Sequence, residues 1–270
     1  MPDTTQVNDQ ISIEREGDIA LICIDNPPVN ATGMDVRKGL QEAINRLNAE
    51  GTAKVIAIYC AGRTFVAGAD IREFGKPPVA PYLPDLLNAI EASAIPVISI
   101  IHGTALGGGL ELGLATHARI GIEGLRVGLP EILLGLLPGA GGTQRLPRLA
   151  GIPFALDVIL SGRQVPGAEA LEHGIIDRLT TGNPRDVALA AAADVLAGKL
   201  PTRRTDQLQT TPDDVALANT AAYLRKTQGQ LYSPHKCVEA VAASTGPLPE
   251  GLKIERQAFM DCMNTPQRAG

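Results

Sequence analysis

Residues 96–114 read PVISIIHGTALGGGLELGL, an apolar run that leads into three consecutive glycines. The pattern of residues 97–101 predicts a buried strand. The run Gly107, Gly108 and Gly109 should then open a short helix that ends near Ala115. A strand that enters a helix through glycines leaves unpaired backbone NH groups at the positive end of that helix. An anion or a developing oxyanion belongs there, although the glycines could instead serve only a tight turn.

The segments on either side repeat the alternation of strand and helix. A hairpin is predicted from residues 11–14 and 19–25, a helix from residues 34–48, and a buried strand from residues 55–60. Another strand is expected at residues 118–122, and the pattern is helical from Pro184 onward. This alternation predicts an α/β fold. We expect residues 1–199 to form its core and residues 200–270 to form a C-terminal helical region.

Composition excludes several classes of function. The 270 residues carry a net charge of -5, which attracts no polyanion, and the lack of Trp leaves few rings to stack on bases, so no nucleic-acid partner is expected. The four cysteines form no CxxC pair and predict no metal site or disulfide scaffold. Apolar runs of about six residues fall short of the ~20 that span a bilayer. A polar start without Lys or Arg indicates a cytoplasmic protein without a membrane partner.

Two glutamates stand out as candidates for acid–base chemistry. Glu111 falls in the first turn of the helix that the glycines open, where the helix dipole favours an ionised carboxylate. Glu131 has the apolar neighbours Leu129, Ile132 and Leu133, and burial among them would raise its pKa. Two carboxyl groups in contrasting surroundings make an acid and base pair. The alternatives are a capping residue for Glu111 and a surface loop residue for Glu131.

The loop of residues 61–70 is the third candidate, because it follows a buried strand at the end where α/β proteins bind ligands. It could also be an ordinary connection. Other chemistries fit poorly: no serine stands in GxSxG, no histidine pair in HExxH, and the glycine runs match neither phosphate-binding signature. His102 and His117 are interpreted as structural.

Three ordered motifs identify a family. AGRTFVAGADIREF at residues 61–74, the stretch quoted above, and GLPEILLGLLPGAGGTQRLPR at residues 128–148 closely resemble the enoyl-CoA hydratase/isomerase family, the crotonases. The resemblance runs from about residue 11 to residue 179 and continues more loosely to EGLKIERQAF at residues 250–259. His117 before Arg119 and this last segment point to the hydratase/isomerase portion of multifunctional β-oxidation enzymes. The chain is thus either a separate hydratase or a fragment.

The resemblance implies roles for individual residues. Glu111 and Glu131 match the two glutamates that add water across the 2,3 double bond of an enoyl thioester, and the NH groups of Ala67 and Gly108 match the oxyanion hole. Arg63 is a candidate for the coenzyme A phosphates, as are Lys253 and Arg256. The remaining substrate contacts implied by the motifs are Val66, Gly68, Ala69, Asp70, Gly107, Gly139 and Gly141.

The resemblance also implies a fold and partners. The fold would be a crotonase-like spiral of ββα units with a C-terminal helical region that supports trimers or hexamers, unless the chain is a fragment. No separate cofactor is expected, because coenzyme A arrives as part of the acyl-CoA substrate. Two other functions remain open: a Δ3-Δ2-enoyl-CoA isomerase, in which Glu131 alone shuttles the proton, and a non-catalytic binding protein of the same fold.

Overall fold

The computed structural model describes residues 3–73, 76–77 and 79–269, so that Phe74 of the first motif lies outside the described residues. Seven strands form the main sheet in the order β1-β2-β3-β4-β5-β7-β10. The pairs β1–β2 and β2–β3 are antiparallel, and the other pairs are parallel. The bounds are β1 (Asp3–Asn8), β2 (Ile11–Glu16), β3 (Ile19–Ile24), β4 (Val55–Cys60), β5 (Val97–Ile101), β7 (Ala118–Ile122) and β10 (Arg178–Thr180).

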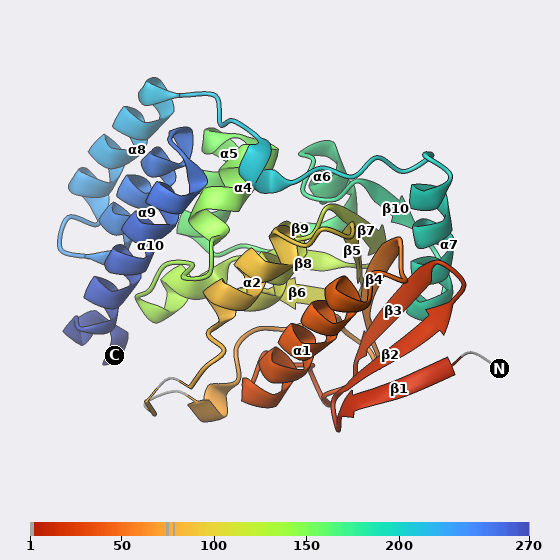
Figure 1. Cartoon of the computed structure of the whole chain (residues 1–270). Coiled ribbons are helices and arrows are strands. Elements are labelled where there is room, and N and C mark those ends of the chain that lie inside the picture. The colour runs from red at the N-terminus through yellow and green to blue at the C-terminus, as the bar shows by residue number, and fades with distance from the viewer. Residues whose placement is uncertain (1–2, 74–75, 78, 270) are drawn as a thin grey trace.

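A second sheet has three strands in the order β6-β8-β9, and its strand β6 leads directly into the glycine run. Its strands are β6 (Thr104–Leu106), β8 (Arg126–Gly128) and β9 (Val165–Pro166). Helices connect and cover the two sheets (Figure 1). They are α1 (Met34–Glu50), α2 (Leu83–Glu91), α3 (Gly108–Leu114), α4 (Gly142–Ala150), α5 (Ile152–Ser161), α6 (Gly167–Glu172), α7 (Pro184–Leu196), α8 (Asp214–Thr227), α9 (Ser233–Ala242) and α10 (Leu248–Met263). The short 3-10 helices are η1 (Ile71–Glu73), η2 (Pro130–Leu134), η3 (Thr205–Gln207), η4 (Ala243–Thr245) and η5 (Pro266–Ala269).

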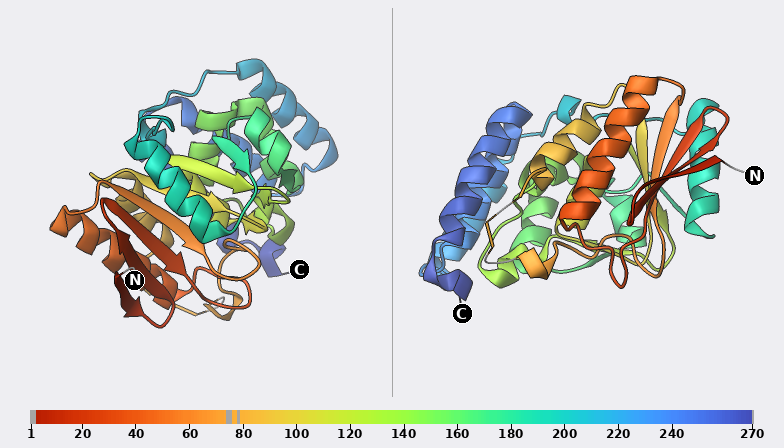
Figure 2. Two further views of the ribbon diagram at one scale, coloured as in Figure 1. Left: turned by 90° about the vertical axis from the view of Figure 1, so that its right-hand side faces the viewer. Right: turned by 60° about the horizontal axis from the view of Figure 1, so that its bottom comes forward.

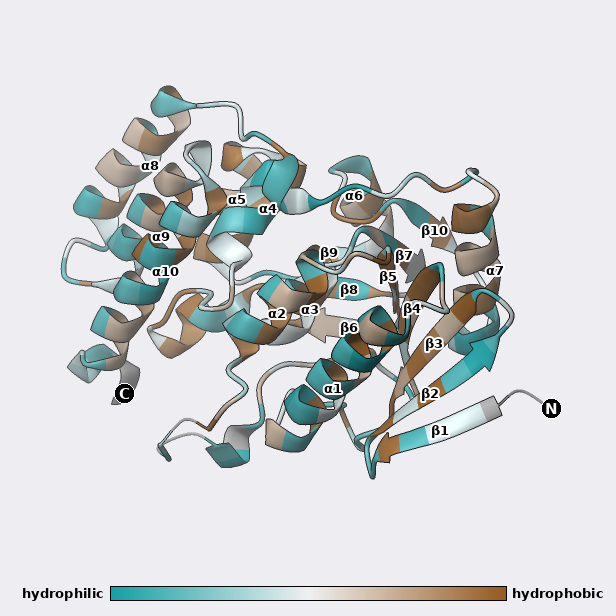
Figure 3. Ribbon diagram, viewed as in Figure 1, coloured by the Kyte–Doolittle hydropathy of each residue, from teal (hydrophilic) through white to brown (hydrophobic). Residues whose placement is uncertain are grey.

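Both faces of the central strands of the main sheet are buried, because helices cover each of them. Successive side chains of a strand point to opposite faces. On β3, Ala20, Ile22 and Ile24 pack in the larger core with α1, whereas Ile19 and Leu21 pack in the smaller core with α7. Figure 3 accordingly shows β3 in the hydrophobic colour, while β1 at the sheet edge is paler and partly hydrophilic.

The sequence predictions for the strands are largely confirmed. The predicted hairpin is β2–β3, and the strands expected at residues 55–60, 97–101 and 118–122 are β4, β5 and β7. The polar start of the chain shows no apolar alternation that predicts a strand, yet residues 3–8 form the edge strand β1. Backbone pairing with β2 forms this strand without an apolar face of its own. Helices α5 and α6 and strands β6, β8, β9 and β10 were not predicted either.

The C-terminal helices form one end of the molecule, away from the N-terminal strands (Figures 1 and 2). Their buried side chains, such as Cys237 on α9 and Ala258 on α10, belong to the same apolar core as the sheet residues that face α1. Helix α10 packs against α9 and α4. In the described part of the chain, no helix has the length and hydropathy that a bilayer span requires.

Candidate active site

The glycine run is shaped by close contacts on every side. Strand β6 enters Gly107, whose φ of 52° and ψ of -127° suit glycine, and α3 begins at Gly108. A Cβ on Gly107 would lie 2.9 Å from Oε1 of Glu131. A Cβ on Gly109 would lie 1.9 Å from the carbonyl oxygen of Val66. A side-chain rotation cannot remove this clash, because the oxygen belongs to the backbone. The glycines therefore let α3 begin in direct contact with Glu131 and with the loop after β4.

Glu111 lies in the first turn of α3, 3% exposed, as the sequence predicted. Its Oε1 accepts hydrogen bonds from the backbone NH groups of Ala140, at 2.7 Å, and Gly142, at 2.8 Å. Burial raises the pKa of Glu111, whereas these two NH donors and the charge of Arg145 act to lower it. The side chain is thus a buried carboxyl group with fixed donors on one oxygen.

Glu131 has the opposite surroundings. It stands in η2, just after β8, and its Oε1 faces Gly107. Its Oε2 is buried and has no hydrogen-bond partner among the residues that the structure describes. Burial, and after it the charge of Glu111, raise the pKa of Glu131 well above the ordinary value. Glu111 and Glu131 therefore interact electrostatically, and Glu131 is the one that favours its protonated form.

A third buried carboxyl group, Glu255 of α10, was not predicted as a site residue. It is 1% exposed and accepts hydrogen bonds from the NH groups of Gly141, at 2.6 Å, and Thr143, at 2.9 Å. Burial and the charge of Glu111 raise the pKa of Glu255 to about 8. Glu255 stands in the segment EGLKIERQAF, whose pattern does not distinguish it from its exposed neighbours. The sequence therefore does not predict that α10 buries it against Gly141 and Thr143, more than a hundred positions earlier.

The backbone donors differ in part from the prediction. Gly108 is the first residue of α3, and its NH has no acceptor in residues 3–73, 76–77 and 79–269. The NH of Ala67, however, donates to the carbonyl oxygen of Val29 at 3.1 Å. This hydrogen bond contradicts the choice of Ala67 as an oxyanion donor, because its amide is already satisfied.

Ala69 offers a free donor in the same loop. The carbonyl of Gly68, which belongs to the peptide that carries the Ala69 NH, accepts from the NH of Thr32 at 3.0 Å and from its hydroxyl group at 3.4 Å. This peptide is therefore fixed, while the NH of Ala69 has no acceptor in the described part of the chain. Thr32 also neighbours α3, since a Cβ on Gly108 would lie 3.5 Å from its Oγ1.

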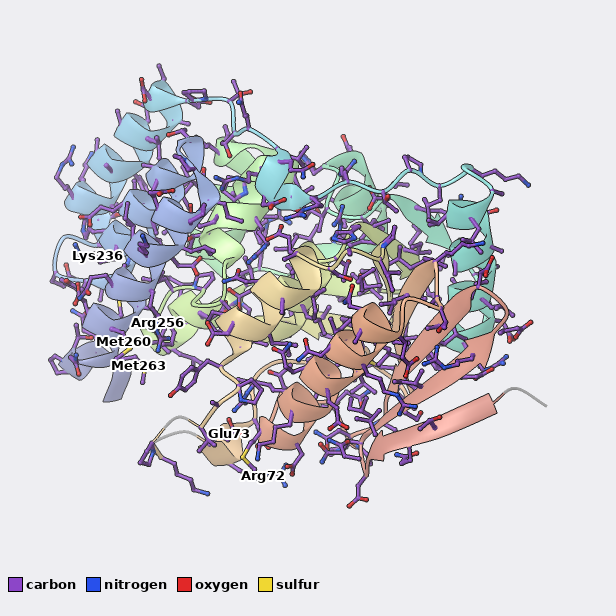
Figure 4. The ribbon with its side chains drawn as sticks, in the orientation of Figure 1. Arg72, Glu73, Lys236, Arg256, Met260 and Met263 are labelled. Carbon is purple, nitrogen blue, oxygen red and sulfur yellow. The ribbon has the colours of Figure 1, made fainter. Side chains whose placement is uncertain are left out.

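The other predicted contacts lie around this centre. Val66 is buried behind Gly109. Asp70 follows Ala69 and accepts from Arg72 at 2.7 Å, and Arg72 holds the pKa of Asp70 below its usual value. Figure 4 shows Arg72 on η1, with Arg256 on α10. The guanidinium group of Arg256 lies 5.7 Å from the centre of the Phe259 ring, and that ring packs against Gly139.

The three basic side chains proposed for the coenzyme A phosphates are all exposed, Arg63 in the loop after β4 and Lys253 and Arg256 on α10. Exposure leaves these side chains accessible to an anionic ligand. His117 bridges elements instead of facing the glutamates: its Nδ1 accepts from the NH of Val97 at 2.9 Å, and its Nε2 lies 3.0 Å from the carbonyl oxygen of Glu91. The interpretation of His117 as structural is confirmed.

Comparison with known proteins identifies the family of this chain. The sequence profile described as Enoyl-CoA hydratase/isomerase matches residues 14–228, most of the chain. The chain belongs to the enoyl-CoA hydratase/isomerase family. It is 43% identical over 254 residues to the peroxisomal bifunctional enzyme of Danio rerio, covering 92% of this chain and 35% of that protein. The chain thus spans about a third of the length of this curated relative.

Other relatives, closer to this chain in length, align with most of it. A protein of Bacillus subtilis named probable enoyl-CoA hydratase is 38% identical over 196 residues, which are 70% of this chain and 75% of that protein. Among solved structures, the enoyl-CoA hydratase from Bacillus anthracis is similar with a TM-score of 0.64 and 27% identity, covering 97% of this chain and 93% of that chain. The expected crotonase fold, with its C-terminal helices, is confirmed.

Proposed function

We propose that this protein is an enoyl-CoA hydratase that adds water across the 2,3 double bond of a 2-enoyl-CoA thioester in fatty-acid β-oxidation. The observation that carries the proposal is the contrast between the two buried glutamates. Glu111 is held by two NH donors, whereas Glu131 is desolvated and its Oε2 has no hydrogen-bond partner in the described ranges of the chain. Such a contrast favours one base and one acid at the same centre.

The reaction follows from these states. Glu111, as the carboxylate, takes a proton from the water whose oxygen forms a bond to C3. The electrons of the double bond move toward the thioester carbonyl, and Glu131 delivers a proton to C2. The NH groups of Gly108 and Ala69 stabilise the negative charge on the thioester oxygen, each contributing about 3 kcal/mol to the transition state. Ala69 replaces Ala67 in this role, because the Ala67 amide is engaged with Val29.

Substitution of Glu131 by Gln tests the proposal. The amide keeps the shape of the side chain but has no proton to deliver, so that hydration of crotonyl-CoA should fall by roughly 10³-fold or more. Glu123→Gln, in an exposed turn, is the matched control and should hydrate like the wild type. Turnover that is unchanged in Glu131→Gln would reject the assignment.

Isomerisation of a 3-enoyl-CoA to a 2-enoyl-CoA is the second candidate. Oε2 of Glu131, which accepts no hydrogen bond from any described residue, favours it, since such a carboxylate can remove a proton from C2 and return it to C4. A wild type that fails to hydrate, together with Glu111→Ala that still isomerises a 3-enoyl-CoA, would assign the isomerase. Calorimetry that detects no binding of any CoA ester would instead support a non-catalytic role.

The substrate class brings further proposals. Coenzyme A would enter as part of the acyl-CoA thioester, with its adenine near residues 67–70 and its phosphates near Arg63, Lys253 or Arg256. We also propose assembly into trimers or hexamers, which light scattering would reveal. The name of the zebrafish relative places that protein in peroxisomes. A cytoplasmic location of this chain stays a prediction.

A further inference from the structure

Four successive residues at the start of α4 connect two buried carboxyl groups. Ala140 and Gly142 donate their NH groups to Oε1 of Glu111, and Gly141 and Thr143 donate theirs to the two oxygens of Glu255. The donors alternate along the chain, so that α3 holds one side of the turn and α10 holds the other. Neither carboxyl group can change its position without moving NH groups that lie next to those of its counterpart.

The turn has few other ways to satisfy these donors. Its NH groups precede or begin α4, where no carbonyl within the helix can accept from them. Gly141 has a φ of 104°, a conformation that glycine adopts without strain and that aims successive amides in different directions. The positive end of the helix dipole adds to the attraction of both carboxylates. Thr143 donates its hydroxyl group to Glu255 as well, at 2.6 Å.

Helix α10 contributes Glu255 as part of a packed surface. Phe259, one turn further along α10, packs so closely on Gly139 that a Cβ there would lie 2.6 Å from its ring. Leu252, almost one turn before Glu255, lies 3.2 Å from the position of a Cβ on Gly141. The turn therefore rests on three successive turns of α10, with the carboxyl group of Glu255 at the centre.

We propose that Glu255 is a positioning residue, which fixes the turn of residues 140–143 and thereby aims the carboxylate of Glu111 at the attacking water. This proposal rests on the proposed function, since it assigns Glu111 as the base. Glu255 is assigned to position the turn rather than to react, since both of its oxygens accept hydrogen bonds from Gly141 and Thr143. Its effect on the reaction passes through the turn.

The charges around Glu255 come from several elements. Glu111 on α3 raises its pKa, and Glu255 in turn contributes to the raised pKa of Glu131 on η2. Arg145 on α4 faces Glu111, and Cys237 on α9 is buried near both Glu131 and Glu255. Removal of the charge of Glu255 should therefore lower the pKa of Glu131. Since Glu131 acts as an acid, the alkaline limb of the kcat/KM profile should move to lower pH.

The variants Glu255→Gln and Glu255→Ala test the proposal, with Glu250→Gln, an exposed glutamate on the same helix, as the matched control. Misplacement of a catalytic group by about 1 Å costs on the order of 10²-fold. We expect Glu255→Ala to lower kcat on crotonyl-CoA about that much while KM changes by less than about 2-fold. Glu255→Gln keeps one acceptor oxygen and should lie between Glu255→Ala and the wild type, with its alkaline limb displaced.

A readout without activity separates this proposal from the proposed function. In a crystal structure of Glu255→Ala, the turn should shift and Glu111 should lose at least one of its bonds to Ala140 and Gly142. If Glu255→Ala does not fold, the same measurements on Glu255→Gln decide. A full kcat with an unmoved pH profile, or a turn and Glu111 that stay in place, would overturn the positioning role. A wild type that turns over no enoyl-CoA would refute the proposed function alone, because the crystallographic comparison would still stand.

Discussion

At the scale of single residues, the glycines of the run Gly107 to Gly109 are required because other groups occupy the space of a side chain. Each glycine of the run meets a different neighbour: Glu131 at Gly107, Leu83 at Gly108 and Val66 at Gly109. The neighbour at Gly109 is a backbone oxygen, which cannot rotate away as a side chain can. This position should therefore tolerate substitution less well than a glycine whose only constraint is its backbone conformation.

Gly109→Ala should destabilise the fold more than Gly51→Ala. A Cβ at Gly109 would stand 1.9 Å from the Val66 oxygen, so the loop must move, at a cost of roughly 3 kcal/mol. Gly51 caps α1 with a φ of 61° and has open space around it, so alanine there should cost only about 1 kcal/mol of backbone strain. Urea unfolding measures both, and equal losses would contradict the steric explanation.

At the scale of elements, an ion pair ties α2 to the start of α4. Arg145 is fully buried and donates to Oε2 of Glu91 at 2.7 Å and to Oδ1 of Asn88 at 2.9 Å. It also donates to the carbonyl oxygen of Ala140, at 3.1 Å, in the turn that holds Glu111. The pair therefore supports the site from the side opposite α10. Breaking one partner alone would leave a buried charge without compensation.

Arg145→Met should lower the free energy of unfolding by about 3–5 kcal/mol, because the buried carboxyl group of Glu91 would lose its ion-pair partner. The double variant Arg145→Met/Glu91→Gln should recover much of that loss, which a double-mutant cycle measures as an interaction of roughly 1–3 kcal/mol. The exposed pair Lys54–Asp18 is the control, and Lys54→Met should cost at most about 1 kcal/mol. Additive effects of Arg145→Met and Glu91→Gln would show that the two side chains do not depend on each other.

At the scale of the whole molecule, three carboxyl groups from three elements are buried together. The pKa of Glu111 is raised, that of Glu131 is raised well above its ordinary value, and that of Glu255 is raised to about 8. Between the ordinary range of a glutamate and these folded values, the folded protein binds more protons than the unfolded chain. The contribution of these groups to stability is therefore complete at low pH and is lost as pH rises through their raised pKa values, which for Glu255 is about 8.

Glu131→Gln should make this effect visible. The neutral amide has no proton to lose, so the Tm of the variant should exceed that of the wild type by a margin that grows from pH 5 to pH 8. A protein of this size gains about 2–4 °C in Tm for each kcal/mol. Circular dichroism at several pH values gives the two curves, with Glu250→Gln as the control that should parallel the wild type. Parallel curves for Glu131→Gln would show that its burial costs nothing.

Much of this protein was determined by local sequence. The strands at residues 55–60, 97–101 and 118–122 and the helix after Gly107 follow from apolar patterning and backbone preference, which act within a few residues. The same patterning placed Glu111 in a first helical turn and Glu131 among apolar neighbours. Desolvation by near neighbours depends on nearby sequence, so the raised pKa of Glu131 could be predicted without coordinates. The two NH donors that hold Glu111 could not, because they come from residues 29 and 31 positions away.

Only the tertiary structure decided which distant groups meet. Glu255 accepts hydrogen bonds from Gly141 and Thr143, which precede it by 114 and 112 positions. The NH of Ala67 donates to the carbonyl oxygen of Val29, which belongs to another loop. Neither contact leaves a mark on local composition or periodicity. Hydrogen bonds between distant segments depend on where packed elements bring their donors and acceptors, and that position is set by the folded core as a whole.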